Sequence, residues 1–199
     1  MKRSSRMTIQ QATEDYERWL AGFLEIVPED LAAKHEKMAG AIFPFLRATY
    51  YRWAQLYPHV CKELGRAPQV LAVGDLHVEN FGTWRDAEGR LVWGVNDFDE
   101  ATNLPYTLDL VRLATSAGLA AAEGHLNLDL KEACAAVLAG YTGALRSGGR
   151  PMVLAENDRW LRKLATGRLR DPIVFWERIR GLPTARGKVD PNVHGLLLQ

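Results

Sequence analysis

The sequence is poor in cysteine, has no long apolar segment and carries almost no net charge. Its two cysteines, Cys61 and Cys134, lie far apart without C-x-x-C spacing, which argues against a disulfide scaffold and fits a reducing compartment. No segment approaches about 18 consecutive apolar residues, and the N-terminus lacks the apolar core of a secretory signal. The 25 basic and 24 acidic side chains give a formal charge of +1, so no global field attracts nucleic acid or an anionic membrane. We therefore expect a cytoplasmic protein with no nucleic-acid partner and no membrane partner.

The first third of the chain has the apolar spacing of helices. With 47% hydrophobic residues, the 199 residues suffice for one sizeable core, and one domain is the default expectation. Apolar residues at helical intervals predict a helix over 13–27, and Pro28 followed by acidic residues predicts a new helix start. Helical character continues over the aromatic-rich segment 43–57, which Pro58 is expected to close.

The middle of the chain changes to strand character. The β-prone run at 69–73 predicts one strand, and residues 81–84 and 91–95 predict a hairpin around the turn-like R-D-A-E-G. Later helices are expected at 107–123, 128–145, 155–164 and 172–179.

These patterns predict an α+β fold that is predominantly helical. We expect a single domain, 1–199, in four parts: a helical N-terminal part (1–66), motif-bearing strands and loops (67–110), a second helical part (111–180) and a tail (181–199).

The segment AVGDLHVENFG, residues 72–82, gathers acidic, imidazole and carboxamide side chains directly after an apolar run. Asp75 and Asn80 stand in the D-L-x-x-x-N spacing of a kinase catalytic loop, in which the Asp accepts the hydroxyl proton of the substrate and the Asn binds magnesium. Downstream, VNDFDEA places Asp97 at the end of an apolar strand. Magnesium prefers oxygen ligands in octahedral geometry, so Asn80 and Asp97 are expected to share one Mg²⁺ with water and phosphate oxygens. Asp75 is then the candidate base that orients an acceptor hydroxyl.

Three segments, VGDLHVENFG, GVNDFDEA and LPYTLDLVRLA, resemble the aminoglycoside and choline phosphotransferase branch of the protein-kinase-like superfamily. Within that branch they resemble an uncharacterised bacterial family, domain of unknown function 2252. The resemblance runs from about Met38 to Leu113 and continues weakly toward the C-terminus. It implies the fold of the catalytic, C-terminal lobe of a kinase, with the site on a short β-hairpin. It also implies the transfer of phosphate from ATP, with Mg²⁺, to the hydroxyl of a small-molecule substrate.

The same resemblance assigns roles to residues. It implies that Asp75 is the catalytic-loop Asp, that Asn80 and Asp97 are the metal ligands, and that Asp109 steadies the catalytic loop through hydrogen bonds. The segment FPFLRA also resembles a family segment, which suggests that Arg47 leans toward the site.

The sequence departs from the resembling enzymes at several positions. Val73 stands where related phosphotransferases carry the His of an H-G-D motif, and Asp99 stands where protein kinases have Gly. The residues before Asp75 read as helices, without a G-x-G-x-x-G segment or a V-A-I-K strand. In longer family members such elements are expected downstream, in the order of a permuted kinase. We therefore expect a truncated chain, whose partner would be a complementing nucleotide-lobe segment or a second copy of itself.

Each candidate residue also has an alternative interpretation. Asp75 could cap the turn after a strand, and Asp109 could cap its helix. Asp99, a candidate cofactor-binding residue, and Glu100 could provide a second metal ligand or form a solvated turn. His77 could hydrogen-bond the loop backbone, ligate a metal or take part in catalysis by contacting substrate. Arg47 could act at the site or simply pair with a nearby carboxylate.

Three functions are compatible with these patterns. The first is an ATP- and Mg²⁺-dependent phosphotransferase acting on a small-molecule hydroxyl, or the catalytic lobe of one. The second is a non-catalytic kinase-like interaction module. The third is a metal-dependent phosphoesterase, because G-D-L-H also resembles the D-x-H opening of two-metal hydrolases. Such hydrolases need further histidine motifs, whereas His125 and His194 stand alone in the sequence.

Overall fold

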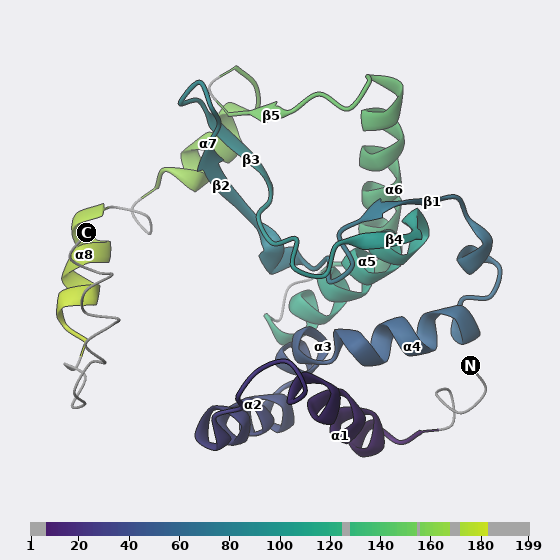
Figure 1. Ribbon diagram of the computed structural model, residues 1–199. Coiled ribbons are helices and arrows are strands. Elements are labelled where there is room, and N and C mark those ends of the chain that lie inside the picture. Colours follow the sequence, from purple (N-terminus) through teal and green to yellow (C-terminus); the bar gives the residue numbers. More distant parts are fainter. Residues whose placement is uncertain (1–6, 125–127, 155, 168–171, 183–199) are drawn as a thin grey trace. The chain divides into compact units, whose positions relative to one another are not determined.

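The computed structural model describes residues 7–124, 128–154, 156–167 and 172–182 (Figure 1). By its internal contacts the chain falls into two compact units, Met1–Met152 and Val153–Gln199, which are considered separately. Both helices and short antiparallel strand pairs occur, so the fold is α+β, as expected from the sequence. No helix in the described part of the chain has the length and apolar character needed to cross a membrane.

The elements follow one another in this order. The first unit contains α1 (Ile9–Leu20), α2 (Pro28–Gly40), α3 (Ile42–Ala48), α4 (Tyr50–Val60), η2 (Leu64–Arg66), β1 (Gln69–Ala72), η3 (Val78–Asn80), β2 (Phe81–Arg85), β3 (Leu91–Val95), β4 (Thr102–Pro105), α5 (Tyr106–Glu123) and α6 (Leu130–Arg146). Strand β5 (Met152–Val153) spans the boundary, and α7 (Arg159–Ala165) and α8 (Pro172–Arg180) belong to the second unit.

Helix α1 begins and ends earlier than its apolar spacing predicts. Thr8 accepts a hydrogen bond from the backbone of Gln11, whose side chain accepts one from the backbone of Thr8, and this capping box fixes the start. The helix ends at Leu20, so the expected helix over 13–27 is wrong in its last turns. The predicted new start at Pro28 is confirmed.

The segment expected as one helix over 43–57 is two helices. The hydroxyl of Thr49 donates to the carbonyl of Phe45 and so occupies the acceptor that a continuous helix would give to a backbone N–H. Pro58 does not close α4, which continues to Val60. Proline lacks only its own N–H, and the residue after α4, Cys61, still donates to the carbonyl of Tyr57.

Two antiparallel strand pairs frame the motif-bearing loop. The predicted hairpin is confirmed: β2 pairs with β3, with Phe81 opposite Val95 and Arg85 opposite Leu91. Strand β1 pairs with β4, a strand that the sequence did not suggest, with Gln69 opposite Pro105. The loop that follows β1 therefore runs from the β1–β4 pair to the β2–β3 hairpin.

Helix α5 carries the buried face on which the first unit assembles. It lies beside the β1–β4 pair in Figure 1, and it also packs against α3 and α6. Leu108, Arg112 and Ser116 recur one turn apart and are almost completely buried. Leu108 packs against Tyr50 and Tyr57 of α4, which forms the apolar centre of the unit. Arg112 is thus a charged side chain in a core position.

In the second unit, α7 starts later than the sequence predicts. The helix begins at Arg159, after Asp158 in the left-handed conformation (φ 54°), rather than at residue 155. The later helical segment expected at 172–179 is present as α8. Most of the expected tail, 183–199, lies outside the described residues.

Candidate functional site

The loop that carries the motif is fixed from behind by α5. The carboxylate of Asp109 accepts hydrogen bonds from the backbone N–H groups of Val73 (2.8 Å) and Gly74 (2.9 Å). Gly74 has a φ of +88°, and a Cβ placed there would lie 2.6 Å from the carbonyl oxygen of Glu100. Glycine is therefore required at this point of the turn. The contacts of Asp109 are those of a residue that steadies the loop rather than a cap of its own helix.

Arg112 holds the carboxylate of Asp75 in place. The Arg112 side chain is 0% exposed, and its Nε (2.6 Å) and Nη2 both donate to Oδ1 of Asp75. Nη2 also donates to the carbonyl of Leu46 at 2.8 Å, and the guanidinium stacks over Tyr50 and Trp53. Burial lowers the pKa of Arg112, and the negative charge of Asp75 opposes this effect. Since Oδ1 is occupied by Arg112, Oδ2 is the oxygen of Asp75 left for other contacts.

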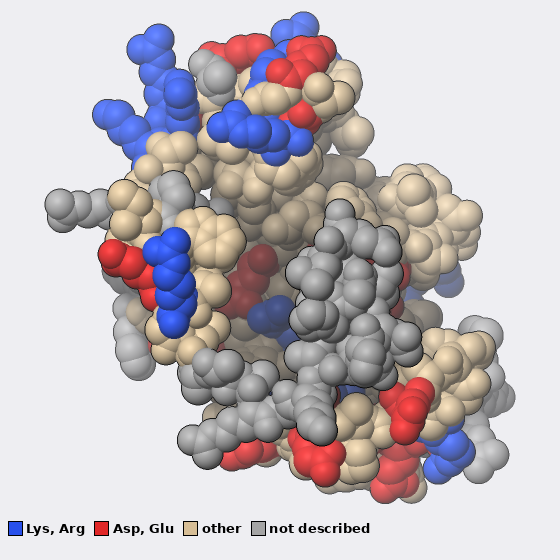
Figure 2. Space-filling model, turned by 60° about the vertical axis from the view of Figure 1, so that its left-hand side comes forward, with Lys and Arg blue, Asp and Glu red and all other residues tan. Residues whose placement is uncertain are grey.

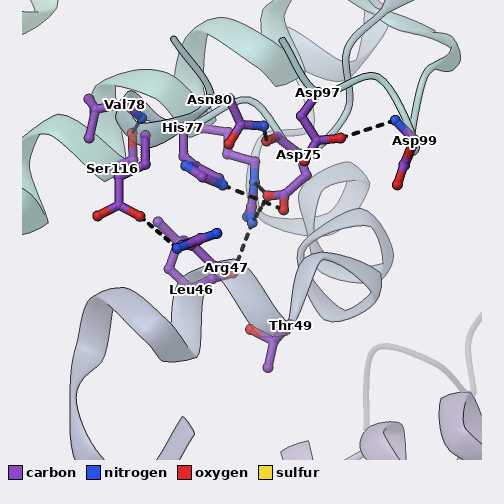
Figure 3. A network of polar contacts seen from close by, with 12 residues as sticks. Leu46, Arg47, Thr49, Asp75, His77, Val78, Asn80, Asp97, Asp99 and Ser116 are labelled. Atoms are coloured by element: carbon purple, nitrogen blue, oxygen red, sulfur yellow. Dashed lines mark hydrogen bonds and ion pairs between the residues drawn. The ribbon is translucent and has the colours of Figure 1, made fainter. Parts of the chain in front are cut away.

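Asn80 and Asp97 lie at neighbouring ends of the hairpin. The backbone N–H of Asn96 donates to the carbonyl of Asn80 at 2.9 Å, which extends the β2–β3 ladder by one pair. Nδ2 of Asn80 donates to the backbone carbonyl of Asp75 at 2.8 Å. In Figure 3, Asp75, Asn80 and Asp97 form one group. The three oxygen-bearing side chains that the sequence singles out therefore meet at one place.

A cleft of about 530 Å³ opens in front of this group. Its lining includes the predicted residues Arg47, Asp75, His77 and Asp97. Figure 2 shows both acidic and basic side chains on the face that it draws. Volumes of roughly 300–1,000 Å³ are usual for small-molecule sites.

His77 is buried at the edge of the cleft. Its side chain lies edge-on to the ring of Phe43, and its Nε2 is 3.8 Å from Oδ2 of Asp75. Nδ1 is buried without a hydrogen-bond partner in the described residues, so the loop-bracing hydrogen bond that a lone histidine often makes is not formed by this ring nitrogen. Burial lowers the pKa of His77, although the charge of Asp75 opposes the shift. His77 is consequently neutral near pH 7.

Arg47 reaches the cleft and also has an acidic partner. Its Nη1 lies 2.6 Å from Oε2 of Glu79, and both side chains are about half exposed (51% and 55%). An exposed pair of this kind contributes little to stability. The two interpretations of Arg47, site residue and partner of a carboxylate, are therefore compatible.

Acidic side chains crowd the end of β3. Asp99 donates its backbone N–H to Oδ1 of Asp97 at 3.3 Å, and Asp99 itself is exposed. The pKa of Glu100 is raised by partial burial and then by the charges of Asp75, Asp99 and Asp97. The repulsion among these carboxylates is the kind that a bound cation relieves.

The donor set fits a hard cation only in part. Among the described residues, no group of three or more His, Cys, Asp and Glu side chains is arranged to hold a metal ion. One carboxylate (Asp97) and one carboxamide oxygen (Asn80) remain as candidate ligands, which is sufficient for Mg²⁺ because it keeps several waters and takes phosphate oxygens. A two-metal hydrolase site needs more protein ligands than these, and His125 and His194 lie outside the described residues.

Sequence reasoning missed two residues that organise the site. One is Arg112, and the other is Ser116, whose Oγ accepts from the backbone N–H of Val78 (3.1 Å) and donates to the carbonyl of Leu113 (2.7 Å). A signal was present, because Arg112 and Ser116 are polar residues one turn apart in an apolar helix that also carries Asp109. Polar residues on the apolar face of a helix need buried partners.

Comparison with known proteins identifies the family. Residues 26–170 match the family described as an uncharacterized protein conserved in bacteria, DUF2252. The chain belongs to this family. No curated protein and no solved structure matches the chain. All the residues of the site, from Arg47 to Ser116, lie within the matched range, so the cleft belongs to the part of the chain that defines this DUF2252 protein.

Proposed function

We propose that this DUF2252 protein is a kinase-like phosphotransferase, or the catalytic lobe of one, which transfers phosphate from ATP to the hydroxyl of a small molecule. The observation that supports the proposal is that Asp75 and Asp97 line one cleft, while Asn80 lies behind it, bonded through its side chain to the backbone of Asp75 (2.8 Å) and paired with Asn96, the residue before Asp97 (2.9 Å). These residues come from a loop and from the two neighbouring ends of a hairpin, and phosphoryl transfer depends mainly on such positioned groups.

Each residue has a distinct task in this proposal. Asp75 is oriented by Arg112, and its free Oδ2 accepts the hydrogen bond of the acceptor hydroxyl. Phosphoryl transfer depends more on positioning than on proton abstraction, so the task of Asp75 is to orient this hydroxyl. Asn80 and Asp97 would hold Mg²⁺, which supplies charge neutralisation for the phosphate oxygens. Asp109 keeps the loop in the conformation that Asp75 needs.

A binding experiment tests the metal pair. Calorimetric titration of the full chain with ATP, in the presence and absence of Mg²⁺, is expected to show binding that depends on the metal. Asp97→Asn removes the carboxylate charge with little change in size and is expected to abolish this response. Asp15→Asn is the matched control, because Asp15 is an exposed acid paired with Arg18 outside the cleft.

The outcomes separate the candidate functions. Metal-dependent binding that survives in Asp97→Asn would refute the assignment of this residue as a ligand. A folded wild-type chain that binds neither Mg²⁺ nor ATP would contradict the phosphotransferase proposal and favour a non-catalytic kinase-like module.

A further inference from the structure

One wall of the cleft, formed by α2 and α3, carries three cationic side chains. Helix α2 lines the cleft with Asp30, Lys34 and Lys37, and α3 adds Arg47. Positions 30, 34 and 37 recur about one turn apart, so they share one face of α2. Asp30 is the one carboxylate of this wall, and Lys34 and Arg47 each also lie beside a carboxylate outside the lining, so Lys37 is the cation here without a carboxylate partner among the described residues. Neither the motif nor the proposed metal pair explains this gathering of cations.

The cations differ in how they are engaged. Lys34 lies 3.6 Å from Glu17 and over the ring of Tyr16, so its position is fixed by α1. Arg47 uses Nη1 for Glu79, which leaves its other N–H groups free to donate. Lys37 is exposed and has no hydrogen bond or ion pair to any described residue. One lysine on this wall is therefore available to a ligand.

The basic wall is tied to the position of the candidate base. The guanidinium of Arg112 donates both to Asp75 and to the carbonyl of Leu46, the residue before Arg47. The backbone next to Arg47 is thus held at a fixed place relative to Asp75. An acceptor hydroxyl must come within hydrogen-bond reach of Asp75, so the rest of the acceptor lies within reach of the wall.

We propose that the wall formed by Lys34, Lys37 and Arg47 binds a phosphate group of the acceptor, which makes the acceptor a phosphorylated alcohol. The term acceptor depends on the proposed function, whereas the binding of a phosphate group by this wall does not. Lysine and arginine are the usual partners of phosphate, as a point charge and as a bidentate donor respectively. A neutral or cationic alcohol would leave the charge of Lys37 without a partner in the cleft.

The test uses glycerol 3-phosphate, glycerol and inorganic phosphate as probes of the full chain, without Mg²⁺ or nucleotide and at low ionic strength. Calorimetry is expected to show binding of the two phosphates and none of glycerol, and the affinity should fall as salt is added. Lys37→Gln is expected to weaken glycerol 3-phosphate binding about fivefold, the effect of one charge near 4 Å in a solvated site. Lys62→Gln, which removes an exposed lysine outside the cleft, should change nothing.

A second variant should change the affinity for phosphate in the opposite direction. Glu79→Gln removes the carboxylate that competes for Arg47, so phosphate binding should become tighter, by about two- to fivefold. This gain does not arise from a loss of folding, which makes it informative where Lys37→Gln alone would not be. Equal affinities in wild type, Lys37→Gln and Glu79→Gln would overturn the proposal.

Two further measurements distinguish a phosphate of the acceptor from a phosphate of the nucleotide, and separate failure of this proposal from failure of the proposed function. Displacement of glycerol 3-phosphate by metal-free ATP would assign the wall to the nucleotide and overturn its assignment to the acceptor. Asp97→Asn should retain glycerol 3-phosphate binding, because this variant leaves the wall intact. Phosphate binding without any Mg²⁺-dependent ATP binding would uphold the wall while contradicting the phosphotransferase.

Discussion

Substitution of Arg112 is predicted to cause a large loss of folding stability. Arg112→Met keeps an unbranched stem that packs against Tyr50 and Trp53 but removes the charge that holds Asp75 and the donor to Leu46. Removing one partner of a buried ion pair costs roughly 3–5 kcal/mol. The side chain of Asp75 remains 21% exposed, so water partly solvates the carboxylate left behind, and the lower end of this range applies.

The expected loss of about 3 kcal/mol is readily measured. For a chain of this size it corresponds to a decrease in melting temperature of about 6–12 °C. Urea unfolding of wild type, Arg112→Met, Asp75→Asn and the double variant should give a coupling free energy of at least about 1 kcal/mol. The matched control is Arg66→Met, since Arg66 lies 3.2 Å from Glu63 in an exposed pair and its loss should cost less than about 0.5 kcal/mol.

Two results would contradict this role of Arg112. If Arg112→Met loses no more stability than Arg66→Met, the buried guanidinium does not hold Asp75 in the folded protein. A double variant whose loss equals the sum of the two single losses would likewise show that Arg112 and Asp75 act independently. In either case the orientation of Asp75 would have to come from the backbone of the loop alone.

Two other predictions concern the turn at Gly74 and the protonation of His77. Gly74→Ala should destabilise the protein by about 1–3 kcal/mol, because the φ of Gly74 is +88° and the added Cβ meets the carbonyl oxygen of Glu100. Gly140 lies in a helix with nothing within 4 Å of an added Cβ, so Gly140→Ala should instead stabilise the protein by up to about 1 kcal/mol in the same urea assay. Burial lowers the pKa of His77 from 6.5, so the unfolded chain takes up a proton on this histidine where the folded chain does not, and stability is lost as the pH falls below about 6.5. Urea midpoints measured between about pH 7.5 and 5.5 should therefore fall more steeply for wild type than for His77→Gln, and equal slopes would contradict the neutral, buried state of this ring.

Local patterns in the sequence were sufficient for most elements. The hairpin of β2 and β3 follows from β-prone runs on either side of a turn, and the start of α2 follows from Pro28. Helix boundaries that depend on side-chain hydrogen bonds were predicted less well from the sequence. The capping box of α1 and the Thr49 hydroxyl each changed a helix end by competing locally with the helical pattern.

The residue order alone was enough to single out the candidate side chains: an Asp and an Asn five positions apart in one loop, and an Asp after a strand. Adjacent ends of a hairpin must lie side by side, so the closeness of Asn80 and Asp97 follows from local pairing. Only the tertiary structure decided which side chains orient them. Arg112 reaches Asp75 across 37 positions and Leu46 across 66, and contacts of that separation depend on how α5 packs against α3 and β1. No periodicity encodes such packing, because it arises from the burial of whole helix faces rather than from neighbouring residues.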